Sequence, residues 1–193
     1  TIFWLMTWGA FGLVMGPWLK SLWFTVPGLA AHLTATLWLL IKMVRPIKGD
    51  RKAWTPGMWH LVTSYTWILV PVLVGVLITF KVPGISGTGV EASAPQALIY
   101  GWVLQFGFAL VPYYFRKMFT PNQAAKLGGN WFSLTTVHLG GLSLWISIFM
   151  NDPLAGLFHG SAYALWTLSL LPILKEVWGI INQGTKNLAE GSH

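Results

Sequence analysis

Six long stretches of this chain contain no charged side chain, and all of its Asp, Glu, Lys and Arg residues lie between or beside them. Each stretch has at least 18 residues, which as a helix comes close to the roughly 30 Å hydrocarbon core of a bilayer. Because that core offers no water to unpaired backbone groups, such stretches must cross it as helices. The sequence therefore predicts an all-α fold, a polytopic membrane protein built as a six-transmembrane-helix bundle. The predicted spans are residues 2–24, 27–44, 59–80, 96–116, 131–150 and 153–175.

The composition leaves little length for anything besides these spans. Hydrophobic residues make up 54% of the 193 residues and charged ones only 9%, so residues 1–190 are predicted to form a single transmembrane domain. The last three residues, Gly191-Ser192-His193, resemble the remnant of an expression tag. The absence of cysteine restricts any metal site to His, Met or oxygen ligands. Nucleic-acid binding needs a basic face with a fold of its own, and the predicted spans leave no length for one. Membrane lipid, and not nucleic acid, is therefore the expected partner.

The basic residues are distributed very unequally between the two sides of the predicted bundle. With both termini inside, ten of the twelve Lys and Arg residues lie on the cytoplasmic side, and only Lys20 and Lys81 lie outside. The positive-inside rule therefore predicts cytoplasmic termini and a multi-pass protein of the cell inner (plasma) membrane. The ten inner residues are Lys42, Arg45, Lys48, Arg51, Lys52, Arg116, Lys117, Lys126, Lys175 and Lys186.

Glycine and proline mark the connections between the spans. Two breaker clusters, Gly16-Pro17 and Thr25–Gly28, compete for the first turn. We expect the turn at the second cluster, because Pro27 suits the first turn of a helix, and a kink at the first cluster. The segment Lys81–Pro95 is expected to be a flexible external loop, and Asn151–Pro153 a tight external turn.

Four histidines lie within predicted spans, where ionisable side chains are costly and therefore suggest function. His32 and His159 each lie five or six residues in from the outer side, and at 1.5 Å per residue both are roughly 8 Å deep. We call them the outer tier. His60 and His138 enter from the cytoplasmic side at less closely matched depths, and they form the inner tier.

Two histidines from different helices at one depth can hold a haem iron or contribute to a copper site, because neutral imidazole is a good ligand for both metals. The candidate ligands for a b-type haem or for copper are His32, His60, His138 and His159. Alternatively, each imidazole hydrogen-bonds a neighbouring helix, which stabilises membrane proteins by up to about 1–2 kcal/mol. Tryptophans deep in the spans, such as Trp67, allow the same two interpretations, contact with a haem or quinone or simple helix packing.

Part of the chain resembles a known family. Residues 94–102 (APQALIYGW) and 111–116 (VPYYFR) resemble a helix of the haem-copper oxidase subunit I superfamily. The order Trp54, Trp59-His60 and Trp67–Pro71 is similar to NnrS-type haem- and copper-containing membrane proteins. The resemblance covers about residues 50–150 and implies a membrane fold suited to haem, as in a cytochrome of a respiratory electron-transport chain.

The resemblance also draws attention to His138. Where the family carries its ligand histidine, this chain has Gln96, and His138 could take over ligation of an inner-leaflet haem. Gly140 and Gly141 follow it and would let a macrocycle approach the backbone closely. The same glycine pair could equally let two helices pack closely.

Three functions remain open from the sequence. The first is a redox subunit that binds b-type haem through intramembrane histidines and passes electrons to or from a quinone or a partner protein. The second is a cofactor-free structural or assembly subunit, in contact with other membrane subunits or with copies of itself. The third is a small-solute channel or carrier gated at breaks such as Gly16-Pro17, Pro71 and Pro112. Carboxylate-based relays and hydrolases are excluded, because no carboxylate lies inside a predicted span.

Overall fold

The computed structural model describes residues 1–83 and 87–190, and the expected tag remnant at 191–193 lies outside this range. The described residues form helices joined by turns, with no strand among them, which confirms the all-α fold. The chain divides into two compact units. Unit 1 comprises Thr1–Arg51 and the helical segment from Val72 to Thr79, and unit 2 comprises Lys52–Pro71 and the helices from Gly87 onward.

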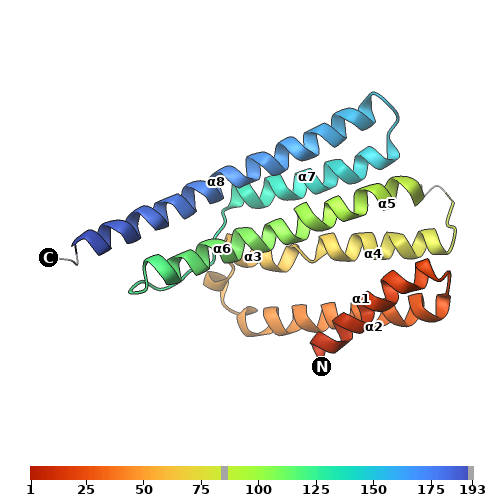
Figure 1. Ribbon diagram of the computed structural model, residues 1–193, viewed down its shortest axis with the longest axis horizontal. Helices are drawn as coiled ribbons and strands as arrows, with labels where there is room; N and C mark the ends of the chain where they lie inside the picture. The colour runs from red at the N-terminus through yellow and green to blue at the C-terminus, as the bar shows by residue number, and fades with distance from the viewer. Residues whose placement is uncertain (84–86, 191–193) are drawn as a thin grey trace. The chain divides into compact units, whose positions relative to one another are not determined.

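Two antiparallel helices, α1 (Ile2–Trp18) and α2 (Leu22–Val44), form a hairpin in unit 1 (Figure 1). They meet along a seam of small residues. A Cβ added to any of the three α1 glycines in this seam would lie 2.6–2.7 Å from a backbone atom of the residue that it faces. Only glycine therefore allows the two backbones to approach so closely. The facing pairs are Gly9 with His32, Gly12 with Gly28, and Gly16 with Thr25.

The turn between these helices corrects the predicted first boundary. The sequence predicts a turn at Thr25–Gly28, but the chain turns at Leu19–Ser21, and Pro27 lies inside α2. Lys20 adopts a left-handed backbone conformation there, with φ 49°. Pro17 belongs to the last turn of α1, so its cluster ends the helix. The glycine seam accounts for the position of the turn, because its three facing pairs are centred on residues 20 and 21.

The third predicted span is broken into two helices. α3 (Pro56–Thr63) and α4 (Thr66–Thr79) are separated by a turn at Ser64 and Tyr65. Ser64 is fully buried, so the break lies in the protein interior. It also lies one turn after His60, next to a predicted site residue. The short helices that precede α3 are η1 (Arg45–Ile47) and η2 (Arg51–Ala53).

The fourth predicted span is longer and less regular than expected. The segment expected to be a flexible loop, Lys81–Pro95, is helical from Gly87 onward, which corrects the predicted start of the span at 96. Burial of Val90 and Ser93 stabilises a helix that its own glycines disfavour. A π-helix follows, and such wide turns are frequent at functional sites. The consecutive elements are α5 (Gly87–Gln96), the π-helix η3 (Ala97–Val103) and α6 (Leu104–Phe119).

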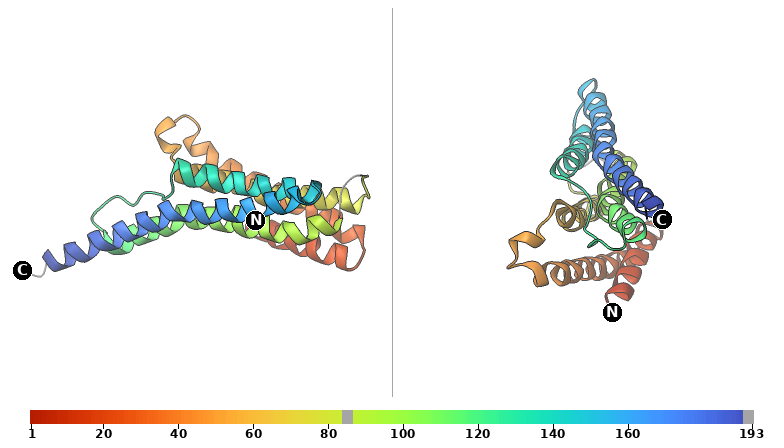
Figure 2. Two further views of the ribbon diagram at one scale, coloured as in Figure 1. Left: turned by 90° about the horizontal axis from the view of Figure 1, so that it is seen from above. Right: turned by 90° about the vertical axis from the view of Figure 1, so that its left-hand side faces the viewer.

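The last two helices, α7 (Trp131–Phe149) and α8 (Leu154–Glu190), lie side by side in Figures 1 and 2. A capping box begins α7: Asn130 Oδ1 accepts from the amide of Ser133 (2.8 Å), and the Ser133 hydroxyl accepts from the amide of Asn130 (3.1 Å). α7 covers nearly the same residues as the span predicted at 131–150. α8 has 37 residues and extends well past the end predicted at 175 (Figure 2).

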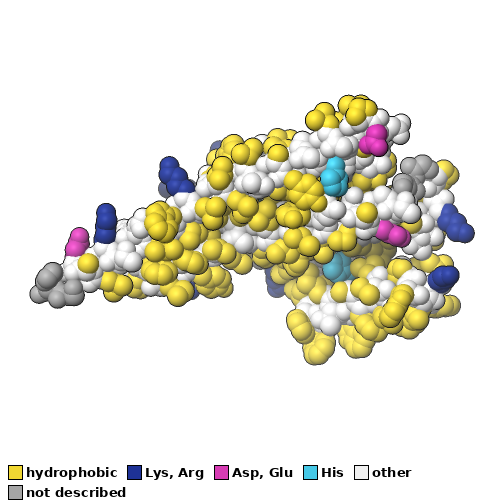
Figure 3. Space-filling model, turned by 45° about the horizontal axis from the view of Figure 1, so that its top comes forward, with side chains coloured by type: hydrophobic (Ala, Val, Ile, Leu, Met, Phe, Trp, Pro, Cys, Tyr) yellow, Lys and Arg dark blue, Asp and Glu magenta, His cyan; other side chains and the backbone are white. Residues whose placement is uncertain are grey.

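Within the described ranges, five helical segments are long and apolar enough to cross a membrane, consistent with a multi-pass membrane protein. The apolar helix α1 is shorter, with 17 residues. Figure 3 shows hydrophobic side chains over much of the visible surface. The count of six spans, the single transmembrane domain and the cytoplasmic termini stay predictions. The five segments are Leu22–Ile47, Pro56–Thr79, Gly87–Phe119, Trp131–Phe149 and Leu154–Glu190.

Candidate functional site

Six buried or half-buried side chains of unit 2 form a hydrogen-bonded network, which we call the inner histidine network. It contains both histidines of the inner tier and joins α3, α4, α6 and α7. Polar groups in an apolar interior are costly unless they are paired. The partner of each ring nitrogen therefore decides whether that nitrogen is free to bind a metal. The members are His60, Thr63, Trp67, Gln105, Ser133 and His138.

His60 is fully buried in α3, whose first turn is capped by the hydroxyl of Thr55, accepting from the amide of Met58 (3.3 Å). The imidazole Nδ1 is 3.2 Å from Gln105 Oε1. The Gln105 side-chain nitrogen donates to the carbonyl of Gly101 (2.7 Å), which turns Oε1 toward His60. Since an amide oxygen only accepts, Nδ1 of His60 carries a proton.

The other ring nitrogen of His60 faces a hydroxyl. Nε2 is 2.9 Å from Ser133 Oγ, which is also 2.9 Å from the carbonyl of Asn130. The hydroxyl has one proton, and beside a neutral ring it donates that proton to Nε2. The Asn130 carbonyl is still satisfied, because it accepts from the amide of Leu134 (3.0 Å). Every polar group around neutral His60 is therefore paired within the protein.

His138 is held in a single tautomer. The indole N–H of Trp67 donates to Nδ1 at 3.1 Å, so that nitrogen carries no proton. The proton of the neutral ring is then on Nε2, which lies 2.8 Å from the hydroxyl of Thr63. Thr63 accepts this proton while it donates its own to the carbonyl of Trp59 (2.7 Å). A metal ion at either nitrogen of His138 would have to displace one of these partners.

Glycines allow Trp67 to reach this position. A Cβ added to Gly101 of η3 would lie 2.3 Å from Trp67 Cγ, and one added to Gly141 of α7 would lie 2.4 Å from its Cη2. Gly140 meets the indole of Trp166 of α8 in the same way, at 2.6 Å from Nε1. The two indoles therefore occupy the space beside Gly140 and Gly141. Of the two interpretations of this glycine pair, close packing is the one that the described contacts match.

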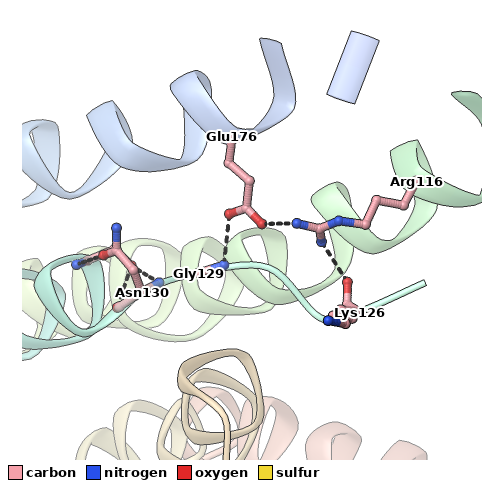
Figure 4. A network of polar contacts seen from close by, with 6 residues as sticks. Arg116, Lys126, Gly129, Asn130 and Glu176 are labelled. Carbon is pink, nitrogen blue, oxygen red and sulfur yellow. Dashed lines mark hydrogen bonds and ion pairs between the residues drawn. The ribbon is translucent and has the colours of Figure 1, made fainter. Parts of the chain in front are cut away.

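An ion pair fixes the loop that leads into α7 (Figure 4). Arg116 of α6 and Glu176 of α8 are 2.5 Å apart, from Nη2 to Oε1. Glu176 Oε2 also accepts from the amide of Gly129 (3.1 Å), and Arg116 donates to the carbonyl of Lys126 (2.7 Å). Gly129 has φ +91°, and a Cβ there would lie 2.6 Å from His60 Cδ2. The ion pair therefore holds this backbone directly against the inner histidine network.

The outer-tier histidine of unit 1 has different surroundings. His32 lies in α2, and both of its ring nitrogens are buried without a hydrogen-bond partner among the described residues. The hydroxyl of Thr36, one helical turn further along, is also buried and unpartnered within that part of the chain. Leaving such a group unpaired costs roughly 1–3 kcal/mol, and the indole N–H groups of Trp102 and Trp145 are buried and unpartnered in the same way in the described structure.

The outer-tier histidine of unit 2, His159, lies in α8 and lines an open groove of about 540 Å³. Its ring has no hydrogen bond in the described structure and contacts Tyr163, with ring centroids 5.3 Å apart. The Tyr163 hydroxyl donates to Gln96 Oε1 (2.7 Å), so Gln96 holds a tyrosine. The groove lies among α5, α7 and α8, and its lining includes Ser93 and Gly156.

The four predicted site residues therefore separate into two kinds. The inner tier is occupied by protein partners and the outer tier is not, while ligation of haem or copper stays a prediction for all four histidines. Sequence reasoning missed Gln105, Ser133 and Thr63. A single Gln in an apolar stretch and the Asn130-x-x-Ser133 capping pattern could have indicated the first two. Nothing in the local sequence marks Thr63.

No family model, curated protein or solved structure matches this chain. The resemblance to the haem-copper oxidase subunit I superfamily, and the electron-transport role that it implies, therefore stay predictions.

Proposed function

We propose that this protein is an integral membrane redox subunit that binds a b-type haem through the outer-tier His32 and passes electrons to or from a quinone or a partner protein. One observation carries the proposal: both ring nitrogens of His32 are buried and have no partner in the described structure. A neutral imidazole is a good axial ligand for haem iron. Bound haem would supply one-electron redox chemistry, which no side chain of the four histidine sites supplies alone.

The residues beside His32 support this role. Gly9 of α1 packs directly on its backbone, where an added Cβ would lie 2.6 Å from the His32 amide nitrogen. This contact fixes the α2 backbone that carries the imidazole. The unpartnered hydroxyl of Thr36, one turn away, offers a second polar contact to a bound group. His32 would hold the iron, and Thr36 would position the group that surrounds it.

The inner histidine network supports a structural role. Ligation by His60 would break its contact with Gln105 or Ser133, and ligation by His138 would break its contact with Trp67 or Thr63. The hydroxyls of Ser133 and Thr63 would keep their bonds to backbone carbonyls, but the Trp67 N–H would be left without an acceptor, at a cost of roughly 1–3 kcal/mol. We therefore assign the inner tier to holding the helices together.

A structural or assembly subunit without a cofactor is the second candidate function, and the completeness of the inner histidine network favours it. A protein with this role needs a rigid membrane fold, which such a network provides. In that case the partner of His32 would be a polar side chain of another membrane subunit.

The absorption spectrum of the detergent-purified full chain, oxidised and then reduced with dithionite, separates the two candidates. We expect the spectrum of a b-type haem in the wild type and its loss in His32→Ala. His32→Met supplies another known haem ligand and should retain haem with an altered spectrum. His159→Ala is the matched control from unit 2 and should keep the wild-type spectrum. A wild type without haem would support the structural subunit instead, and an unaltered haem spectrum in His32→Ala would refute His32 as the ligand.

A further inference from the structure

The groove of about 540 Å³ among α5, α7 and α8 has polar groups that the protein leaves unused. Ser93 of α5 lines it, and this side chain is only 6% exposed. Its hydroxyl has no hydrogen bond in the described structure. A hydroxyl without a partner on the lining of a groove is available to a ligand that can accept its proton.

His159 of α8 provides a second polar group on the lining of the groove. Its ring is held by contact with Tyr163, which is itself fixed by its hydrogen bond to Gln96. The ring nitrogens have no hydrogen bond in the described part of the chain. A neutral imidazole has one donor and one acceptor nitrogen, so His159 can donate to a ligand as well.

The groove lining beside His159 is open at two glycines. Gly156 and Gly160 lie on either side of it in α8, and a Cβ added to either would meet no atom within 4 Å. The glycines of α1 are different, because each of those in the seam touches the facing helix. Packing within the described chain therefore does not require glycine at 156 and 160, and the space beside them can take a flat ring.

We propose that this groove binds a membrane-soluble quinone, with Ser93 and His159 donating hydrogen bonds to its carbonyl oxygens. The pattern Gly156-x-x-x-Gly160 also suits a partner helix. A transmembrane helix satisfies its own backbone groups, however, and offers few acceptors to two donors, whereas a quinone offers two carbonyls on a flat apolar ring. This inference rests on the proposed redox function and names its electron-carrying partner.

The test is binding of a short-tailed benzoquinone to the detergent-purified full chain, measured by equilibrium dialysis. Ser93→Ala should weaken binding about five- to tenfold, as expected for one hydrogen bond. Gly156→Leu should abolish binding, because leucine fills the open space. The matched controls should bind like the wild type. They are Ser161→Ala, whose hydroxyl is satisfied by the Phe158 carbonyl (2.8 Å), and Gly179→Leu, which is equally open on the same helix.

The outcomes distinguish the possibilities. A wild type that does not bind the benzoquinone, or a Ser93→Ala variant that binds it as tightly as the wild type, would overturn the site. A wild-type dimer that Gly156→Leu converts to a monomer, with quinone affinity unchanged, would show that a helix occupies the groove. Haem content is read from the spectra of the same samples. Failure of quinone binding with haem intact refutes only this site, and absence of haem with quinone binding intact refutes only the haem proposal.

Discussion

The inner and outer histidines are the same residue type in the same kind of helix, yet their surroundings are opposite. Both ring nitrogens of His60 and of His138 have protein partners, whereas those of His32 have none in the described structure. The difference comes from the neighbouring helices, which supply Thr63, Trp67, Gln105 and Ser133 as partners of the inner-tier imidazoles. An imidazole whose nitrogens are both occupied holds helices together, whereas the buried nitrogens of His32 make no such bond in the described structure.

The largest effect on stability is expected at Trp67, which is 6% exposed and donates to His138. Trp67→Ala removes the indole that packs against Gly101 and Gly141, and it should lower the free energy of unfolding by about 3–5 kcal/mol. Trp178→Ala is the control, because Trp178 is 65% exposed. SDS titration in mixed micelles measures both. If the two variants lost the same free energy of unfolding, the inner histidine network would not be what stabilises the fold.

His138→Ala should have the next largest effect. It leaves the buried N–H of Trp67 without an acceptor and removes the donor to Thr63, at a cost of about 1–3 kcal/mol. His159→Ala should change the same free energy by less than about 0.5 kcal/mol, because its ring has no hydrogen bond to lose in the described structure. If the outer substitution proved as costly as the inner one, the distinction between the tiers would fail.

Double-mutant cycles sharpen the comparison further. The cycle of His60→Ala with Gln105→Leu should give a coupling energy of about 0.6 kcal/mol, and at most about 1.7 kcal/mol, as is typical of hydrogen bonds within membranes. In the haem-free protein, the cycle of His32→Ala with Thr36→Val should give a value near zero, because neither polar group has a partner in the described chain. A larger coupling at His32 than at His60 would reverse the assignment of the two tiers.

The smallest effect is expected at the ion pair that holds the loop before α7. Its side chains are 22% and 24% exposed, so Glu176→Gln should cost only about 0.2–1 kcal/mol, and less at high salt. Unfolding of this variant at low and high salt checks both statements. A loss well above 1 kcal/mol that does not respond to salt would contradict a solvent-screened ion pair.

The broad fold was predictable because it depends on residue type alone. Charge-free stretches indicate apolar helices wherever they occur, and the Asn151–Pro153 cluster lies where α7 and α8 are joined. The first turn was predicted wrongly because Pro27 was treated as a local signal. Contact between the Gly12 and Gly28 backbones decides its position, and that contact appears only when the two helices are paired.

The candidate site was predictable only in part. The histidines could be found because an ionisable residue in an apolar stretch is conspicuous. Whether each one is occupied depends on residues far away in the sequence, such as Gln105 for His60 and Trp67 for His138. The π-helix that presents Gly101 to Trp67 has no pattern of its own in the sequence.

The central claim is that the inner-tier histidines stabilise the fold and that His32 of the outer tier binds haem. Haem absorbance and the free energy of unfolding, measured together on His32→Ala and His138→Ala, test it most directly. We predict that His138→Ala lowers the free energy of unfolding and retains haem, and that His32→Ala loses haem. A haem site emptied by His138→Ala and left full by His32→Ala would contradict the account.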